Sequence, residues 1–252
     1  MASSVKHAEE ICFNRLVWAR KPCLRKVYHS FYETLRRHLK CVPGKLTVEL
    51  GSGMGNLKEV LPECLTTDIF PNDWLDREEN AYALSLPDHS VGNLILFDVW
   101  HHLEYPGTAL REFSRVVVEG GRVILFEPAI SVLGRLVYGS VHPEPLGLRE
   151  PIKWIAPAGF DPARAPYFAA QSRAARIFQR REIESWTSEW DLVSLQTILS
   201  FAYLLSGGFS RPQLYPESFL PAIRWVDRLL ARFTNLLAAR LLIVLEKKLS
   251  NA

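Results

Sequence analysis

The chain has 252 residues, of which 48% are hydrophobic and 23% are charged, a composition typical of one folded globular domain with insertions. The formal net charge is only +3, and no apolar run approaches the ~18 residues that a membrane-spanning helix needs. Because charged residues stand near the N-terminus, the sequence also predicts no export signal. We therefore expect a cytoplasmic protein, with peripheral contact to a membrane as the alternative.

The four cysteines are scattered through the first quarter of the chain, at Cys12, Cys23, Cys41 and Cys64. They form no C-x-x-C pair and have no metal-ligand spacing. They are therefore expected to be free thiols in a reducing compartment. The sequence predicts no metal site.

The first segment, residues 1–44, is basic and mostly helical in pattern. Nine Lys and Arg residues stand against three Glu residues there, and apolar residues recur at three- and four-residue spacing over 5–40. Such a charge run indicates either a solvated helical face or attraction to an anionic substrate or membrane. It is not interleaved with stacking residues or a zinc-finger spacing, so we expect no nucleic-acid partner.

Residues 45–128 alternate between strand and helix patterns after a break at Pro43-Gly44. Helices are predicted to begin at Leu57 and at Thr108, the first ending near Leu61 and the second near Val117. The predicted strands are Leu46–Leu50, Leu65–Ile69, Asn93–Phe97 and Arg122–Phe126. This alternation, with a fully apolar third strand, predicts a parallel α/β sheet.

The turn after the first strand reads "VELGSGMGN", with Gly51, Gly53 and Gly55 in five positions. Three glycines between a strand and a helix are typical of a backbone that a nucleotide-like ligand approaches closely. The spacing differs from the dinucleotide fingerprint, and no phosphate-loop lysine follows. Because the carboxylate of Glu49 would repel a pyrophosphate, a ligand with a cationic group fits better.

This stretch resembles motif I of the class I S-adenosylmethionine-dependent methyltransferases, E/D-x-G-x-G-x-G. The resemblance continues over residues 46–128 through "TTDIF", Asn80-Ala81, Pro87-Asp88, "WHHL" and Arg115-Val116 before a double glycine. It is closest to the small-molecule branch, methyltransferase type 11-like. The resemblance implies a Rossmann-like, seven-stranded, mostly parallel sheet whose last strand is antiparallel.

The resemblance also implies a cofactor, S-adenosylmethionine, and the residues around it. Asp68 would hold the ribose hydroxyls, although a lone acid there also suits a helix cap. Asn80 stands where the family often has Asp, and its carbonyl oxygen can accept the same hydrogen bond from adenine. The full expected set is Glu49, Gly51, Ser52, Gly53, Gly55, Asp68, Ile69, Asn80, Ala81, Phe97 and His101.

Two histidines are the candidates for catalysis, His102 and His142. Histidine titrates near neutrality and suits removal of a proton from an acceptor hydroxyl. His102 could equally be a packing residue that shapes the pocket. His142 and Glu144, fixed between prolines in "VHPEP", belong either to a rigid surface loop or to a wall that faces the substrate.

Two insertions, 129–190 and 205–240, are expected to form helical caps on the substrate side. The second contains a predicted amphipathic helix over Pro221–Arg240, with arginines on one arc and apolar residues on another. That helix would pack on the core or cover the pocket mouth and a lipid-like substrate. The whole chain, 1–252, is interpreted as one methyltransferase domain.

We therefore expect an S-adenosylmethionine-dependent methyltransferase that acts on a small-molecule, lipid-linked or saccharide-linked acceptor. The alternative is a protein that binds the cofactor as a scaffold, without turnover. Release of S-adenosylhomocysteine in an acceptor screen would separate the two.

Overall fold

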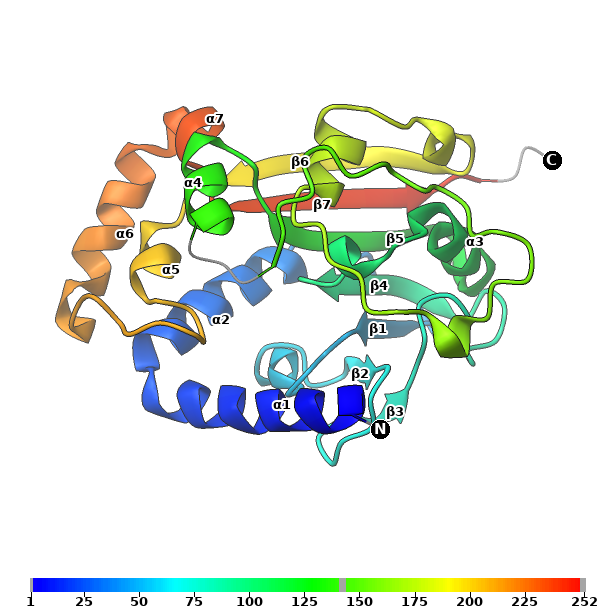
Figure 1. Cartoon of the computed structure of the whole chain (residues 1–252), viewed down its shortest axis with the longest axis horizontal. Coiled ribbons are helices and arrows are strands. Elements are labelled where there is room, and N and C mark those ends of the chain that lie inside the picture. The colour runs from blue at the N-terminus through cyan, green and yellow to red at the C-terminus, as the bar shows by residue number, and fades with distance from the viewer. Residues whose placement is uncertain (1, 141–143, 250–252) are drawn as a thin grey trace.

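The computed structural model describes residues 2–140 and 144–249, with the backbone alone for 2–8. Within these residues, seven strands form one sheet in the order β3-β2-β1-β4-β5-β7-β6 (Figure 1). Strands β1 to β5 pair in parallel, and β7 runs antiparallel to its neighbours β5 and β6. The strands are β1 Leu46–Leu50, β2 Leu65–Asp68, β3 Arg77–Glu78, β4 Val91–Phe97, β5 Val117–Pro128, β6 Trp190–Ile198 and β7 Arg240–Lys247. The predicted mostly parallel sheet with an antiparallel last strand is confirmed.

The central strand β4 is buried on both faces, because its alternate side chains enter two separate cores. Leu94 and Leu96 pack with helix α3 (Pro106–Val116) on one face. Ile95 packs with helix α2 (Pro22–Arg36) and helix α5 (Phe201–Leu205) on the other. The near-continuous apolar sequence of β4 matches a strand covered by helices on both sides.

The predicted helix over 5–40 is two helices, α1 (Ala2–Arg20) and α2. The break falls at Lys21, whose backbone is not helical (φ −114°, ψ 84°), because Pro22 disfavours the helical region for the residue before it. Helix α2 buries Leu24, Val27, Phe31 and Leu35, the expected three- and four-residue spacing, against the sheet.

The helix predicted to begin at Leu57 is only a 3-10 turn, η1 (Asn56–Glu59). Leu57 and Leu61 are both buried in the core beside α2, and Pro62 follows directly. Because proline removes the N–H that the next helical turn needs, the segment goes on to β2 without a full helix.

The first insertion, after β5, begins with helix α4 (Val132–Ser140) and is otherwise irregular. Its later part contains the turns η3 (Pro162–Arg164), η4 (Ala175–Gln179, a π-helical turn) and η5 (Ser185–Ser188). Ala174, Ile177 and Phe178 from this part are buried in the core on the α3 side. The insertion is therefore part of the fold and covers one face of the sheet.

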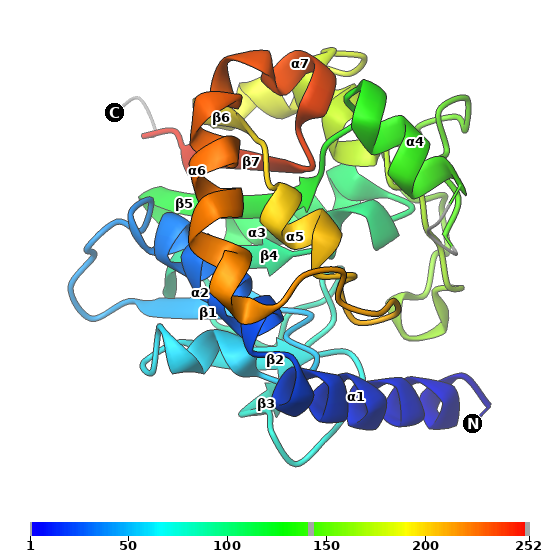
Figure 2. The same ribbon diagram turned by 90° about the vertical axis from the view of Figure 1, so that its left-hand side faces the viewer.

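The second insertion links β6 to β7 and gathers with α4 at one end of the molecule (Figure 2). It consists of α5, η6 (Glu217–Phe219), α6 (Leu220–Leu229), η7 (Ala231–Phe233) and α7 (Thr234–Leu237). The prediction of one helix over Pro221–Arg240 was wrong, because Arg240 already belongs to β7, where it pairs with Pro128 and Ile198. Across the described ranges, no helix is both long and apolar enough to cross a membrane.

Candidate active site

The glycine loop after β1 needs glycine at each of its three positions. Gly51, Gly53 and Gly55 have φ of 69°, 55° and 69°, in the left-handed region that other residues rarely adopt. A Cβ on Gly51 would lie 2.4 Å from Val99 Cγ2, and one on Gly55 would lie 2.9 Å from the carbonyl oxygen of Trp74. The loop can therefore present its backbone to a ligand only with this sequence.

The loop is fastened to β2 by Ser52 and Asp68. Ser52 is buried; its backbone N–H donates to the carbonyl oxygen of Thr67 at 2.8 Å, and its Oγ accepts from the N–H of Thr67 at 3.0 Å. Oδ2 of Asp68 accepts from the N–H of Gly53 at 3.0 Å. The structure thus brings Asp68 against the glycine loop, while the neighbouring Ile69 is about half exposed.

Glu49 presents a buried carboxylate without a complete set of partners. Its side chain is at the end of β1, the residue is 4% exposed, and Oε2 accepts no hydrogen bond from the described residues. Burial raises the pKa of Glu49 to about 7. A buried acceptor left without a donor costs about 1–3 kcal/mol, so this oxygen fits a ligand that brings a donor or a cation.

Helix α1 lies across the glycine loop. Ile11 Cδ1 is 3.3 Å from the position that a Cβ on Gly53 would take, and the Arg15 guanidinium lies 3.9 Å from the ring centre of Trp74. A hollow of about 420 Å³ separates this part of α1 from the loop at Gly55. The basic N-terminal segment therefore packs beside the glycine loop.

Asn80, Ala81 and Phe97 lie farther along the same edge of the sheet. Asn80 Oδ1 accepts from the N–H of Tyr82 at 2.9 Å, and Nδ2 donates to the carbonyl oxygen of Pro162 at 2.9 Å. The Asn80 side chain therefore holds a turn and the first insertion together. Its predicted hydrogen bond to adenine stays a prediction, as does the role of Ala81.

Phe97, the last residue of β4, belongs to an aromatic cluster that surrounds a buried cation. Its ring stacks 4.8 Å from that of Phe126, and the guanidinium of Arg240 lies 5.2 Å from it. Arg240 Nη2 donates to Asp98 Oδ1 at 2.6 Å, and Asp98 has the left-handed φ of 57°. Neither Asp98 nor Arg240 was among the predicted site residues, although an acid directly after a buried strand was a usable signal for Asp98.

His101 follows β4 on the 3-10 turn η2 (Trp100–His102) and is buried between two carboxylates. Its Nδ1 donates to Oε2 of Glu127 at 2.7 Å, and its Nε2 lies 3.4 Å from Oε2 of Glu144. Burial by itself lowers the pKa of His101, but the carboxylates of Glu127 and Glu144 outweigh it and raise the pKa to about 10.

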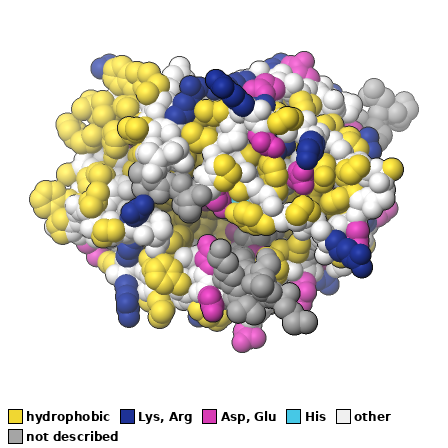
Figure 3. Space-filling view, in the orientation of Figure 1, with side chains coloured by type: hydrophobic (Ala, Val, Ile, Leu, Met, Phe, Trp, Pro, Cys, Tyr) yellow, Lys and Arg dark blue, Asp and Glu magenta, His cyan; other side chains and the backbone are white. Residues whose placement is uncertain are grey.

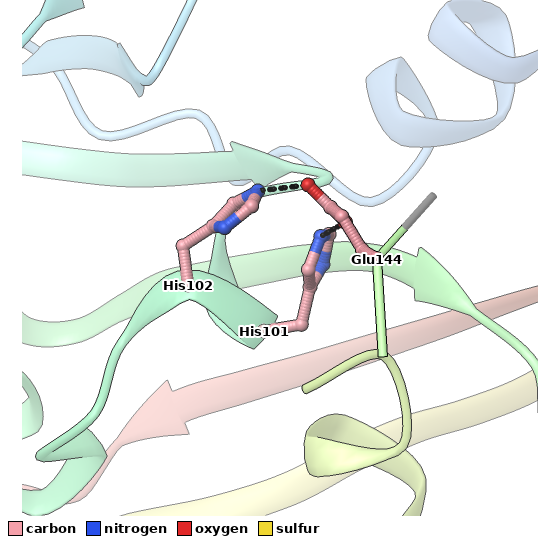
Figure 4. Close-up of side chains that lie close together, drawn as sticks. All are labelled: His101, His102 and Glu144. Carbon is pink, nitrogen blue, oxygen red and sulfur yellow. Dashed lines mark ion pairs between the residues drawn. The ribbon is translucent and has the colours of Figure 1, made fainter. Parts of the chain in front are cut away.

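His102 turns its ring toward the same carboxylate (Figure 4). Its Nδ1 donates to the carbonyl oxygen of Phe168 at 2.9 Å, and its Nε2 lies 3.7 Å from Oε1 of Glu144. Burial and the charge of His101 lower the pKa of His102. Burial alone would raise the pKa of Glu144, but hydrogen bonds from His101 and Tyr167 bring it down to about 2.

The other predicted catalytic residue, His142, lies outside the described residues. Its neighbour Glu144 is described and meets His101 and His102 from across the fold. Glu127, in the buried last part of β5, was not predicted as a site residue. Its position two residues before the first insertion gave no periodic signal, and only the pairing of β5 with β4 places it beside His101.

One family model matches the part of the chain that carries these features. Residues 48–125 match the family model described as a methyltransferase domain. That range begins in β1, includes the glycine loop, His101 and His102, and ends in β5. This part of the chain is thus similar to a methyltransferase domain. No curated protein matches the chain.

Solved structures share the methyltransferase fold at low sequence identity. A chain of the Haloferax volcanii complex between the Trm112 methyltransferase activator and a putative methyltransferase is 14% identical, with a TM-score of 0.57 and 97% of each chain covered. A Thermotoga maritima S-adenosylmethionine-dependent enzyme, described as a possible histamine N-methyltransferase, is 17% identical, with a TM-score of 0.50 and coverage of 94% of this chain and 98% of that one. These likenesses show the fold.

The glycine loop and the unpartnered oxygen of Glu49 fit the methyltransferase's cofactor. S-adenosylmethionine carries a sulfonium and an ammonium group, and either can compensate a buried carboxylate. When bound, the cofactor supplies an activated methyl group. The loop would let its backbone approach the cofactor, and Asp68 and Glu49 would accept hydrogen bonds from it.

Cofactor affinity should therefore depend on pH through Glu49. The pKa of Glu49 is raised to about 7, so below that pH the carboxyl must lose its proton to pair with a cation. We expect the affinity to fall up to about tenfold for each pH unit below 7 and to be level above it. Titration calorimetry from pH 5.5 to 8.5 measures this.

Glu49→Gln should bind more weakly at pH 8 and give a flatter profile, because it has no proton to lose. Glu63→Gln, at an exposed position, should keep the native profile. If the cofactor affinity of the native chain varied with pH as little as that of Glu49→Gln, Glu49 would not be a cofactor-binding residue.

Proposed function

We propose that this methyltransferase transfers a methyl group to an oxygen of a lipid-linked acceptor at an anionic membrane surface. The observation that carries the proposal is a large exposed apolar surface beside the candidate site, contributed by the two insertions. We call it the apolar end. It consists of exposed residues on η6, α4, α6, η7 and α7, namely Val132, Leu136, Phe219, Trp225, Leu229, Phe233 and Leu236.

The side chains of the apolar end are exposed to a degree that is unusual for such large residues. The exposed fraction is 64% for Val132, 66% for Leu136, 60% for Trp225 and 56% for Leu229. Figure 3 shows hydrophobic side chains gathered over α6 and α7. Contiguous apolar patches on a folded protein are typical of sites that contact a partner or a membrane.

Helix α6 is held by its other side, so its exposed residues are not needed for packing. Leu220 is buried in the core, and Asp227 accepts hydrogen bonds from the N–H groups of Phe201 and Ala202 at 2.7 and 3.3 Å. Arg224 donates to the carbonyl oxygen of Lys26 on α2. The outward face of α6 is thus rigid and preformed.

Arginines stand among the apolar residues of this end. Arg135 on α4, Arg228 on α6 and Arg232 on η7 are exposed. Basic residues that border exposed Trp and Leu side chains are typical of helices that lie in the interface of an anionic bilayer. The charges favour anionic lipid over a neutral apolar partner.

Hydrogen bonds join the two segments of the apolar end where they leave the sheet, next to the candidate site. Ser131 Oγ, just before α4, donates to the carbonyl oxygen of Ala238, and Tyr138 Oη donates to that of Ala239. Ala238 and Ala239 directly precede Arg240. Ser131 comes shortly after β5, the strand that carries Glu127. A lipid-linked acceptor would therefore reach the histidines from this surface.

The roles in catalysis follow from the groups that the site offers. In-line methyl transfer needs alignment and exclusion of water, and a hydroxyl acceptor must also lose a proton. We assign proton removal to His102, whose pKa is lowered, and acceptor binding to the neighbouring His101 and Glu144. The acceptor oxygen attacks the methyl carbon, the carbon–sulfur bond breaks, and S-adenosylhomocysteine leaves.

Vesicle flotation combined with turnover tests the proposal. We expect the chain to float with phosphatidylglycerol–phosphatidylcholine vesicles and to release S-adenosylhomocysteine with a polyprenyl-linked saccharide or quinol embedded in them. Trp225→Ser together with Leu229→Ser should weaken vesicle binding by about tenfold or more, because two large apolar side chains are lost.

The matched control changes Val193 and Leu195 to serine. They are exposed apolar residues on β6, outside the apolar end. This pair should leave vesicle binding unchanged. Full turnover of water-soluble acceptors without any binding to vesicles would contradict the proposal.

A further inference from the structure

We infer that His101, His102 and Glu144 form a binding site for one divalent transition-metal ion. The three side chains come from η2 and from the first insertion, and one ligand atom of each lies within 4.8 Å of the others. Metal binding at this cluster is independent of the acceptor. Only the use of the ion in catalysis rests on the proposed function.

The distances are long for hydrogen bonds and close to the spacing of two ligand atoms on one ion. His101 Nε2 and His102 Nε2 lie 3.4 and 3.7 Å from the two oxygens of Glu144, beyond the 2.7–3.2 Å of a good N–H···O hydrogen bond. Two ligand atoms that are each 2.0–2.1 Å from a tetrahedral ion are about 3.3 Å apart. The observed separations need only a small adjustment to reach that value.

Both imidazoles are oriented as in metal sites. Nδ1 of His101 donates to Glu127 and Nδ1 of His102 donates to the carbonyl oxygen of Phe168, so in each ring Nε2 is the nitrogen that faces Glu144 and can bind an ion once it carries no proton. A ligating histidine almost always donates its other N–H to a carboxylate or a backbone carbonyl in this way.

Two further side chains donate hydrogen bonds to the carboxylate of Glu144. Tyr167 Oη donates to Oε1 at 2.6 Å, and Gln171 Nε2 donates to Oε2. Hydrogen bonds to the carboxylate fix its rotation, as supporting groups do for ligating carboxylates. Three ligands on separate, braced side chains are therefore in place.

The surrounding charges favour a divalent cation. Three carboxylates gather here, since Asp98 and Glu127 lie on one side of His101 and Glu144 on the other. The guanidinium of Arg240 pairs with Asp98 and compensates one of them. A divalent cation would place positive charge beside Glu127 and Glu144, and buried charge is stable only when it is compensated.

The donor set indicates which metals to expect. Two imidazoles and one carboxylate suit Zn²⁺, Co²⁺, Fe²⁺ or Mn²⁺ and leave coordination positions open. An open position can take the acceptor oxygen and lower the pKa of its hydroxyl, which then gives its proton to solvent before attack on the methyl carbon. The ion would thus take over the proton removal that the proposed function assigns to His102.

Metal titration of the full chain tests the inference without cofactor or acceptor. Protein stripped with a chelator is titrated with Co²⁺ and Zn²⁺, and binding is followed by calorimetry, metal analysis after dialysis, and the visible spectrum of Co²⁺. We expect one equivalent to bind. His102→Gln and Glu144→Gln should each weaken binding by about 10–100-fold or more, at least the loss seen when groups that support a ligand are changed.

The matched control is His29→Gln, a histidine that lies 2.7 Å from an exposed carboxylate, that of Glu59, on another part of the surface. It should bind the metal as the native chain does, and circular dichroism should show all three variants folded. The inference is overturned if none of Zn²⁺, Co²⁺, Fe²⁺ or Mn²⁺ binds stoichiometrically. It is equally overturned if both cluster variants bind as tightly as the native chain, whereas loss of vesicle binding would bear only on the proposed function.

Discussion

Replacement of Glu127 by alanine is expected to lower the free energy of unfolding by about 3–5 kcal/mol, the usual cost of removing one partner from a buried charge pair. Glu127 is fully buried at the end of β5. Oε1 accepts from the N–H groups of Val99 and Trp100 at 3.0 and 2.8 Å, and Oε2 accepts from His101. Alanine would leave three buried donors without an acceptor.

Urea denaturation at neutral pH measures this loss. Glu127→Gln keeps the volume and one carbonyl oxygen, so it should lose less than Glu127→Ala. Glu63→Ala, at an exposed position on the connection to β2, should change stability by no more than about 0.5 kcal/mol. A loss below about 1 kcal/mol for Glu127→Ala would mean that water or a rearranged turn replaces the carboxylate.

Replacement of His102 by alanine is expected to lower turnover by about 10²–10⁴-fold, the usual contribution of a positioned base or its equivalent. His102 is oriented by Phe168 and faces Glu144, and no contact of its ring with the glycine loop is among the described ones, so the affinity for S-adenosylmethionine should not change. Single-turnover rates and cofactor titration separate the two effects. The exposed His29→Ala is the matched control and should keep the native rate.

The sequence makes the same prediction for His142→Ala, because His142 was the other candidate base. If neither histidine change slows turnover more than a few-fold, proton removal belongs to solvent or to the acceptor, and catalysis is alignment alone. If only His102→Ala lowers the turnover rate, the cluster that contains Glu144 binds the acceptor and removes its proton.

The features that depend on neighbouring residues in the chain were predicted from the sequence. Gly51, Gly53 and Gly55 need a left-handed backbone, and the apolar run of β4 needs cover on both faces. Asp68 is the last residue of its strand, at the edge where parallel strands end, so the parallel pairing of β1 and β2 brings it to the glycine loop. The strands, the glycine loop and the resemblance to the family followed from these local patterns.

The assembly of the site depended on contacts between distant segments. Glu144 meets His101 and His102 across more than forty residues, and Arg240 reaches Asp98 across 142. Such pairs leave no periodic trace, because periodicity reports only which face of a helix or strand is buried.

The same reason explains the wrong helix prediction before β7. The amphipathic pattern continues to Arg240, but the antiparallel pairing of β7 with β5 and β6 takes that residue into the sheet. Tertiary pairing outweighs a local helix preference of a few tenths of a kcal/mol per residue. The sequence by itself determined the sheet and its cofactor loop, and only the tertiary structure decided which charged side chains meet at its edge.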